Sequence, residues 1–421
     1  MSEEEFLNAA LATDIYHQKY NGAGLQKLCN ETRWREGYIF SCEQVGGGIG
    51  NIRAAFLGCL RFTIEAGGAF IIPKINPQKA YGEHGLSSSL TWEAFNEIDQ
   101  VFDRKHFIRT MKSDCPQLEI IDDRSKLWEF QSSSSPIPLN PKELVQTIHN
   151  GSVITNPADW ALAFDAWLEN VHLFTEDGLP LKPSKKVPIR IGLLEESFAW
   201  PIAYDVPDFT DNFGRVFKFP GRLRRLSAKA LYSLYAKFNI QQNPAHVSTK
   251  AFLGAYVGTQ QTRELKPRQS FDEQAAHILE QVALQKLPHI FIASDSPADT
   301  EILRRELQRP RSLPGVDTTN TSSIKMFTVW DLLEDKDHED FKSLTWDQME
   351  LVDHDILLRS SYFVGPSQSN FSWLLALQRQ ASSKNHAYNL GEIPGNTWHD
   401  NRSCIYGSDG ARTMIASPMW V

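Results

Sequence analysis

The stretch Ser41-Cys-Glu-Gln-Val-Gly-Gly-Gly-Ile-Gly-Asn-Ile-Arg53 organises the first half of the chain. It follows the short apolar run 38–40 and leads into residues 54–64, where apolar side chains recur at helical spacing. This order predicts a strand, a glycine turn and a helix. The glycines permit positive φ and close approach to a ligand, and the helix start offers unpaired N–H groups to a phosphate or carboxylate. A tight connection that binds nothing is the alternative.

The composition is that of an ordinary soluble globular protein. With 421 residues, 41% hydrophobic and 22% charged, the chain is long enough for two core-bearing domains. The formal net charge of −8 and the pI near 5.9 disfavour nonspecific coating of nucleic acid, although a local basic patch could dock one. No run approaches the ~18 apolar residues that span a bilayer, so we expect no membrane segment.

Cysteine spacing and the N-terminus favour a cytosolic location. The five cysteines are far apart and include no Cys-x-x-Cys pair: Cys29, Cys42, Cys59, Cys115 and Cys404. This spacing indicates neither a disulfide framework nor a metal site. The acidic N-terminus lacks the basic and apolar regions of a signal peptide. We therefore expect a cytoplasmic protein in which the sequons at Asn30 and Asn401 stay unglycosylated.

Strands and helices alternate in both halves of the chain. Short apolar runs at 69–73 and 118–121 follow the glycine turn, and runs at 252–258, 289–293 and 324–329 recur between helical segments. The pattern predicts an α/β fold with two doubly wound parallel sheets. We expect an N-terminal helical arm at 1–37, domains at 38–185 and 186–380, and a tail at 381–421 that packs back on the body.

Two charged features are candidate binding sites. Glu195 and Glu196 follow the apolar run 187–194, and the carboxyl end of such a strand is where open α/β sheets bind ligands. The segment 213–238 is apolar at helical spacing and basic, and it could face phosphates. For both features the alternative is a solvated surface.

Three stretches in this order resemble the protein O-fucosyltransferase-like glycosyltransferases, in particular their large fungal branch. They are Gly46–Arg53 with Phe70–Pro73, Ile292–Pro297 and Gly365–Ser372. The resemblance covers about residues 38–380. It implies a GT-B architecture, in which two Rossmann-like domains face a central cleft.

The resemblance also implies site residues. Four would line the acceptor side: Gly47, Gly48, Asn51 and Arg53. Six would hold a guanine nucleotide sugar: Asp295, Ser296, Ser369, Asn370, Phe371 and Ser372.

The chain departs from this family at one motif. The family carries His-x-Arg on the strand that opens the second half, and the arginine neutralises the leaving diphosphate. Here Tyr256 and Gly258 occupy those two positions. Because loss of such a clamp costs ~10³-fold or more in rate, the usual fucosyl transfer is not expected unless another arginine, such as Arg263, replaces it.

A substrate with a cationic end and a polyanionic end, such as arginyl-tRNA, would suit the remaining features. The main hypothesis is therefore a tRNA-dependent arginine-containing cyclodipeptide synthase like the fungal cytosolic group of that name. Aminoacyl transfer from arginyl-tRNA and a second aminoacyl-tRNA would be followed by diketopiperazine closure, with no metal or cofactor.

The hypothesis assigns a role to each charged feature. Glu195 and Glu196 would bind the guanidinium and supply a base, and Tyr256, at the family's histidine position, is the third catalytic candidate. The acceptor stem would contact the basic helix through four side chains: Arg222, Arg224, Arg225 and Lys229.

Two alternatives stay open. The first is a GDP-sugar-dependent O-fucosyltransferase-like glycosyltransferase, and the second is a catalytically inactive binding protein of the same fold. An acidic pocket without a diphosphate clamp favours the synthase, an arginine that reaches the cleft favours the transferase, and a closed cleft favours the binding protein.

Overall fold

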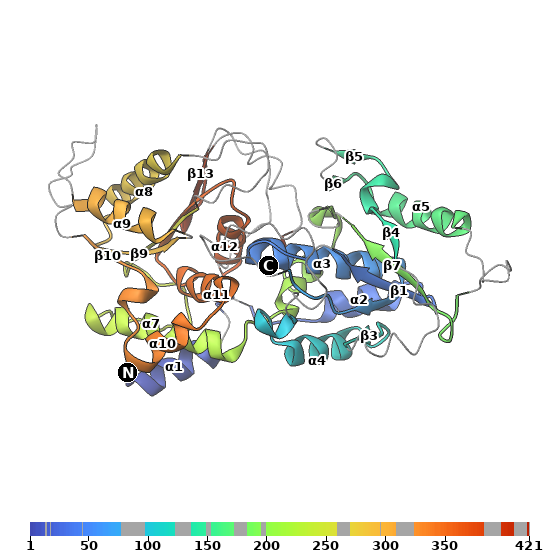
Figure 1. Cartoon of the computed structure of the whole chain (residues 1–421), viewed down its shortest axis with the longest axis horizontal. Helices are drawn as coiled ribbons and strands as arrows, with labels where there is room; N and C mark the ends of the chain where they lie inside the picture. Colours follow the sequence, from blue (N-terminus) through green and yellow to red (C-terminus); the bar gives the residue numbers. More distant parts are fainter. Residues whose placement is uncertain are drawn as a thin grey trace. The chain divides into compact units, whose positions relative to one another are not determined.

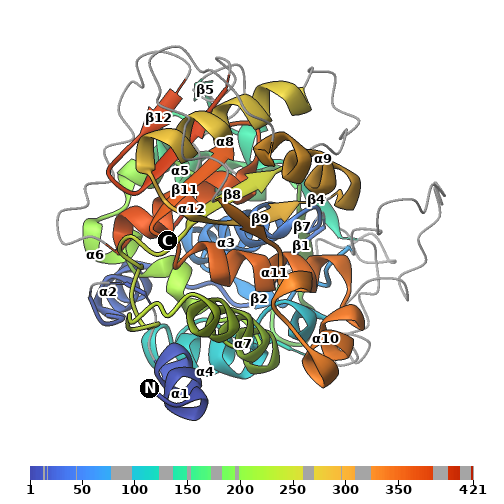
Figure 2. The same ribbon diagram turned by 90° about the vertical axis from the view of Figure 1, so that its left-hand side faces the viewer.

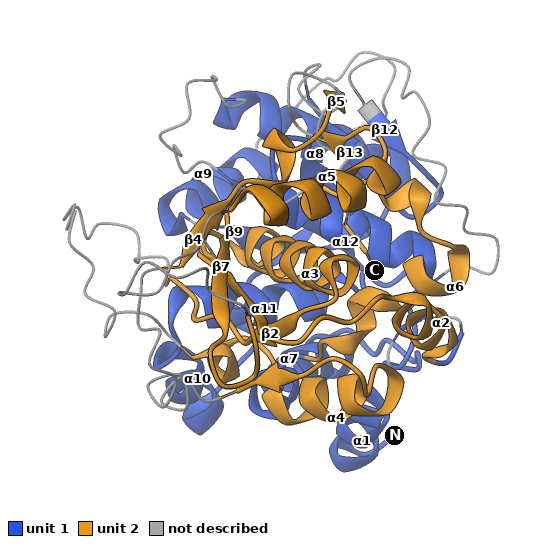
Figure 3. Cartoon of the chain, turned by 90° about the vertical axis from the view of Figure 1, so that its right-hand side faces the viewer, with its two compact units in different colours: residues 1–19, 78–86, 219–412 blue, residues 20–77, 87–218, 413–421 orange. Residues whose placement is uncertain are grey.

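The chain forms two compact units that alternate along the sequence. The computed structural model describes residues 1–12, 15–16, 18–43, 45–76, 97–122, 136–148, 153–171, 183–194, 199–258, 270–294, 296–308, 324–382, 397–407 and 419–420. Unit 1 comprises 1–19, 78–86 and 219–412, and unit 2 comprises 20–77, 87–218 and 413–421 (Figure 3).

Unit 2 is built on a parallel sheet with strand order β3-β2-β1-β7-β4 among the described residues (Figure 1). Its strands are β1 (Tyr38–Cys42), β2 (Ala69–Ile71), β3 (Ile120–Ile121), β4 (Ile137–Leu139) and β7 (Ile189–Leu193), with a separate antiparallel pair β5 (Thr147–Ile148) and β6 (Val153–Ile154). In the central strands Phe40 lies between Phe70 and Ile191. All three side chains are fully buried, as the strands of a covered parallel sheet require.

Helix α3 is the centre of unit 2. The helices of this unit are α2 (Ala23–Glu31), α3 (Ile49–Ala66), α4 (Arg104–Asp114), α5 (Pro157–Asn170) and α6 (Pro207–Thr210), with short 3-10 turns at Ile98–Gln100, Pro141–Glu143, Ile202–Tyr204 and Phe213–Val216. Of the 18 residues of α3, 16 are buried. Phe56 packs on Phe70 of β2 at 5.4 Å between ring centroids, and Phe62 packs on Trp160 of α5 at 4.9 Å. A helix that is buried all round is a core element rather than a covering one.

Unit 1 contains a second sheet, in which strand order is β10-β9-β8-β11-β13-β12 among the described residues. The strands are β8 (Leu253–Val257), β9 (His289–Ser294), β10 (Lys325–Phe327), β11 (Tyr362–Pro366), β12 (Thr397–His399) and β13 (Ser403–Tyr406). Neighbours pair in parallel except β12 and β13, which form an antiparallel hairpin at the edge.

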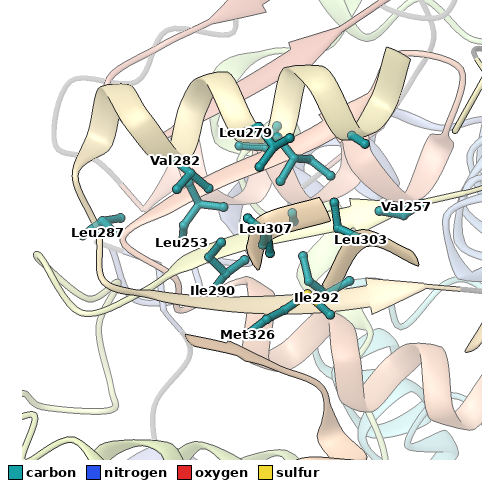
Figure 4. Close-up of a cluster of buried hydrophobic side chains, with 14 of the residues drawn as sticks. Leu253, Val257, Leu279, Val282, Leu287, Ile290, Ile292, Leu303, Leu307 and Met326 are labelled. Atoms are coloured by element: carbon teal, nitrogen blue, oxygen red, sulfur yellow. The ribbon is translucent and has the colours of Figure 1, made fainter. Parts of the chain in front are cut away.

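Helices cover both faces of this sheet. They are α7 (Gly221–Lys237), α8 (Phe271–Gln285), α9 (Pro297–Gln308), α10 (Asp335–Lys342), α11 (Trp346–Leu357) and α12 (Asn370–Ala381), with a 3-10 turn at Val329–Asp331. On one face, Leu279 of α8 and Leu303 of α9 pack with strand residues such as Ile292 (Figure 4). On the other face lies α11, with α7 outside it (Figure 2).

Helix α1 (Glu3–Ala12) forms the outermost layer of unit 1, on α7. Phe6 makes edge contacts with Tyr232 and Tyr235 at 5.5 and 5.3 Å between ring centroids. Arg359 also donates to the carbonyl of Ala10 at 3.3 Å. The N-terminal helix is therefore part of the unit 1 core and not a loose arm.

The prediction of an α/β protein with two mostly parallel sheets is confirmed. Three boundaries differ from those expected. Strand β7 was expected to open the second domain, but it pairs with β1, and the chain passes into unit 1 at residue 219. The segment 1–37 divides, because α1 joins unit 1 and α2 joins unit 2. The tail contributes β12 and β13 to the second sheet, and Trp420 returns to unit 2.

The cysteine prediction was wrong. Disulfides join Cys29 to Cys115 and Cys42 to Cys59, across sequence separations of 86 and 17, while Cys404 is free and buried. The fold brings distant cysteines together, which spacing along the chain does not show. No helix among the described residues is long and apolar enough to cross a membrane.

One buried arginine binds backbone groups at the amino-terminal ends of β11 and β13 in unit 1. Arg379 of α12 has no exposed surface and donates to the carbonyls of Leu357, Leu358 and Ser360 at 3.2, 3.0 and 2.7 Å. It also donates to the carbonyl of Arg402 at 2.8 Å. A single guanidinium thus binds four backbone acceptors, two of which, the carbonyls of Leu357 and Arg402, also accept from the N–H groups of Ser360 and Phe363 at 3.1 and 2.9 Å.

We expect Arg379→Met to lower the free energy of unfolding by ~3 kcal/mol, because it removes four buried hydrogen bonds, including those to the carbonyls of Leu358 and Ser360. Urea denaturation of the full chain measures this loss. Arg305→Met on α9 is the matched control, since that side chain is 69% exposed. Equal stability of the two variants would contradict the role given to Arg379.

Candidate functional site

The glycine turn of unit 2 has the predicted strand–turn–helix form. Gly46 forms a parallel bridge with Asn76, and Gly48 is the N-cap of α3. Gly47 has φ +87°, and a Cβ there would lie 2.9 Å from the side-chain nitrogen of Asn51. Gly48 has φ −66° and ψ 167°, which any residue adopts. Gly47 is therefore the residue of this turn whose backbone conformation favours glycine.

The other two acceptor-side residues differ in their surroundings. Asn51 lies in the first turn of α3 with its side chain against Gly47. Arg53 is only 4% exposed and donates to the carbonyl of Trp420. Arg53 therefore connects α3 to Trp420 of unit 2 through a buried hydrogen bond, whereas Asn51 lies at the turn.

A carboxylate next to this turn was missed by the sequence analysis. Glu43 follows β1 and its N–H donates to the carbonyl of Leu193 in β7 at 3.2 Å. Its side chain accepts from Ser41, and Arg190 of β7 forms an ion pair with it at 3.3 Å. In the strand order β3-β2-β1-β7-β4, the chain runs from β1 through β2 to β3 on one side and then crosses to β4 and β7 on the other, so β1 and β7 flank the switch point where open α/β sheets bind ligands. The signal in the sequence was an acid directly after the first buried strand.

The corresponding switch point of unit 1 lies between β8 and β11. The chain runs from β8 through β9 to β10 on one side, and then crosses to β11 on the other. At the carboxyl ends of these strands, Tyr256 and Phe371 lie with ring centroids 4.6 Å apart, and His354 makes an edge contact with Phe371 at 5.5 Å. Two of the predicted site residues, Tyr256 and Phe371, are thus brought together.

Tyr256 and Gly258, which replace the family's histidine and arginine, are fitted to each other. A Cβ at Gly258 would lie 3.0 Å from the Tyr256 ring. The peptide of Gly258 is also held by Gln274 of α8, which accepts from its N–H at 3.2 Å and donates to its carbonyl at 3.0 Å. A long side chain at position 258 would require Tyr256 to move. The replacement of the family's histidine by Tyr256 and of its arginine by Gly258 are therefore coupled.

Helix starts border the same edge of the sheet. Ser369 is the N-cap of α12 and accepts from the N–H of Ser372 at 3.3 Å, and Asn370 opens the helix. Ser372 has no exposed surface, and its hydroxyl lies against Gly365 of β11. Ser369 therefore caps the helix that Asn370 opens, whereas Ser372 packs the helix on its strand.

Ser296 has a capping role at the neighbouring helix. It is 2% exposed, and its hydroxyl accepts from the N–H of Asp299 at 3.2 Å in the first turn of α9. It orients a helix start that adjoins β9. Among the described residues, no group of three or more His, Cys, Asp and Glu side chains is arranged to hold a metal ion.

The basic helix α7 presents only part of its predicted charge. Arg222 and Arg225 are exposed. Arg224 donates to the carbonyl of Leu11 at 2.7 Å, and Lys229 pairs with Asp337 of α10. Two of the four residues assigned to tRNA therefore hold unit 1 together.

Four predicted residues lie outside the part of the chain that the structure describes: Glu195, Glu196, Arg263 and Asp295. Their roles stay predictions, as does the cleft expected between the two halves.

A pocket of about 700 Å³ opens at the opposite edge of the unit 2 sheet, where Tyr38, Ala69 and Ile120 begin their strands. Ligands of parallel α/β sheets bind at the carboxyl ends of the strands. This pocket contains none of the predicted site residues, and we assign it no part in the site.

Comparison with known proteins returns fucosyltransferase structures. POFUT1 in complex with GDP-fucose has a TM-score of 0.45 and 12% identity, over 88% of this chain and 99% of that one. Fucosyltransferase NodZ from Bradyrhizobium has a TM-score of 0.39 and 14% identity, over 82% and 94%. A mutant of Arabidopsis thaliana FUT1 in complex with GDP has a TM-score of 0.37 and 12% identity, over 84% and 71%.

These values do not by themselves assign an activity to this chain. No family model matches the sequence, and no curated protein matches it. The functional argument therefore rests on the residues of the chain.

We expect Gly47→Ala to destabilise the protein by ~1–3 kcal/mol, because a non-glycine residue is strained at positive φ and its Cβ meets Asn51. Gly48→Ala should cost less, about 0.5–1 kcal/mol, because alanine is a poorer N-cap than glycine but adopts the same φ without strain. Urea denaturation compares the two variants. A larger loss for Gly48→Ala would show that the tight backbone position has been wrongly assigned.

Proposed function

We propose that the chain is a nucleotide-sugar-dependent glycosyltransferase of the O-fucosyltransferase-like kind, whose unit 1 binds the nucleotide diphosphate. The main support is the arrangement at the β8–β11 switch point. There the Tyr256–Phe371 aromatic pair adjoins the capped start of α12. The two buried rings fix the start of α12 against β8, and a helix start offers a positive dipole end to phosphate.

Position 258 lacks the arginine that the family uses to neutralise the leaving diphosphate. This absence is consistent with the proposal if backbone groups stabilise the negative charge of the diphosphate instead. The first turn of α12, which starts at Asn370, presents the positive end of its backbone dipole, while the N–H of Ser369 donates to the carbonyl of Pro366 at 3.2 Å. Neutral donors stabilise a leaving diphosphate less than a guanidinium does, so we expect slow turnover.

Glu43 of unit 2 is our candidate for the general base. Ser41 and Arg190 hold its carboxylate at the switch point of the first sheet. In the transfer, the acceptor hydroxyl oxygen bonds to the anomeric carbon, the bond from that carbon to the diphosphate breaks, and a base takes the hydroxyl proton.

The cyclodipeptide synthase stays the second hypothesis. Of its residues, Glu195 and Glu196 lie outside the described part of the chain, and Arg224 and Lys229 have structural partners. This hypothesis is supported by the exposure of Arg222 and Arg225 and by the absence of the family's diphosphate-binding arginine at position 258. An inactive binding protein is the third.

Calorimetric titration of the full chain with GDP, GDP-fucose and arginyl-tRNA separates the hypotheses. We expect GDP and GDP-fucose to bind, and Asn370→Asp to weaken both at least tenfold, a loss of ~1.4 kcal/mol, because it places a negative charge beside the phosphates. Because the side-chain oxygen of Asn370 is buried, urea denaturation checks that the variant still folds. Asn156→Asp at the N-cap of α5 is the matched control.

Binding of arginyl-tRNA without binding of GDP would overturn the proposal in favour of the synthase. If Asn370→Asp leaves the affinity for GDP unchanged, the start of α12 is not the phosphate-binding site.

Glu43→Gln should slow the release of GDP from GDP-fucose ~100-fold while the dissociation constant for GDP stays the same, because a general base contributes to the chemical step. Glu36→Gln, on the other end of β1 and 76% exposed, controls for loss of a carboxylate. Equal rates for the two variants would exclude Glu43 as the base.

A further inference from the structure

Both disulfides lie inside unit 2. Cys29–Cys115 joins α2 to the end of α4, and Cys42–Cys59 joins β1 to α3, with Cα atoms 5.5 and 5.9 Å apart. All four cysteines are at most 4% exposed. Disulfides of this structural kind form and persist in oxidising compartments and are rare where glutathione and thioredoxin keep thiols reduced.

Asparagine sequons differ sharply in exposure. Asn401, in the sequon Asn401-Arg402-Ser403, lies exposed in the turn between β12 and β13. The side chain of Asp400 accepts from the N–H groups of Arg402 and Ser403, at 2.7 Å each, and so holds the turn. The Asn401 side chain makes no hydrogen bond within the described part of the chain. The tip of a fixed hairpin leaves room for a bulky, solvated group.

Asn30 is the second exposed sequon position. It lies in the last turn of α2, and Thr32 leaves the helix with φ −67° and ψ 134°. The Asn30 side-chain oxygen accepts from Gln117 at 2.6 Å. That bond does not use the amide nitrogen, the atom to which a glycan is attached.

Asn370 provides an internal contrast. Its sequon, Asn370-Phe371-Ser372, runs into α12; Ser372 and Ser403 are both 0% exposed, so the two sequons differ in the asparagine and not in the serine. The side-chain oxygen of Asn370 is itself buried. The folded protein cannot accommodate a glycan there.

We infer that the chain matures in an oxidising secretory compartment and carries N-linked glycans on Asn401 and Asn30 but not on Asn370. The amide nitrogen bonds to the anomeric carbon of a lipid-diphosphate-linked oligosaccharide, the sugar–phosphate bond breaks, and the amide proton leaves. The compartment supplies the oligosaccharide donor and the transferring enzyme. This inference is independent of the reaction proposed above.

The test uses protein purified from its natural source through a tag placed at the end of its gene. Free thiols are alkylated on lysis, and peptide mass spectrometry then records the four cysteines. Peptide N-glycosidase in heavy-oxygen water converts each glycosylated asparagine to labelled aspartate. Because Asn150 and Asn320 are sequons outside the described residues, each site is scored separately.

We expect both disulfides intact, Asn401 and Asn30 converted, and Asn370 unchanged. Asn401→Gln and Asn30→Gln should each remove one step of electrophoretic mobility, and Asn370→Gln should remove none. The inferred oxidising compartment would be contradicted by alkylation of the four cysteines Cys29, Cys42, Cys59 and Cys115. Intact disulfides with unmodified Asn401 and Asn30 would overturn the modification sites, and a glycan on Asn370 would overturn the exposure argument.

Discussion

A buried ion pair between Arg61 and Asp205 holds unit 2 together. The guanidinium on α3 lies 2.8 Å from Asp205 and 2.9 Å from Glu65, and 3.8 Å over the Trp200 ring. Both Trp200 and Trp420 donate their indole N–H to the same Asp205 oxygen. Burial alone would lower the pKa of Arg61, but the two carboxylates outweigh it and the pKa is raised. Loss of one partner would leave an uncompensated buried charge, at about 3–5 kcal/mol.

The candidate site depends on this anchoring. Because α3 is fixed along its whole length, the turn at its start is fixed as well, and the Cys42–Cys59 bond holds the strand before the turn to the helix after it. Glu43 lies inside that closed loop, oriented by Arg190 from the neighbouring strand. Unit 1 instead positions its side chains by fitting Tyr256 over Gly258 and against Phe371. Each unit thus presents rigid elements at the carboxyl edge of its own sheet.

Local patterns in the sequence predicted most strands and helices but not their partners. Short apolar runs and glycine or serine caps identified β1, β2, β8 and β9 correctly. Helix α11 was missed because Asp347, Glu350 and Asp355 interrupt its apolar pattern although the fold buries them. Pairing of β7 with β1, the disulfides, and the burial of Arg53 are set by distant parts of the chain. The same limit hid Arg190 as the partner of Glu43.

The alternation of the two units along the chain bears on how the protein is made. Residues 1–19 belong to unit 1, yet the rest of that unit begins at residue 219, and unit 2 is completed only by residues 413–421. During synthesis, α1 leaves the ribosome long before α7, on which it packs, and Arg53 leaves it 367 residues before its hydrogen-bond partner Trp420. Neither unit can therefore finish folding as an early, independent module, although domains generally do so from the N-terminal end. Each unit completes its fold only once segments that are far apart in the sequence have all been synthesised.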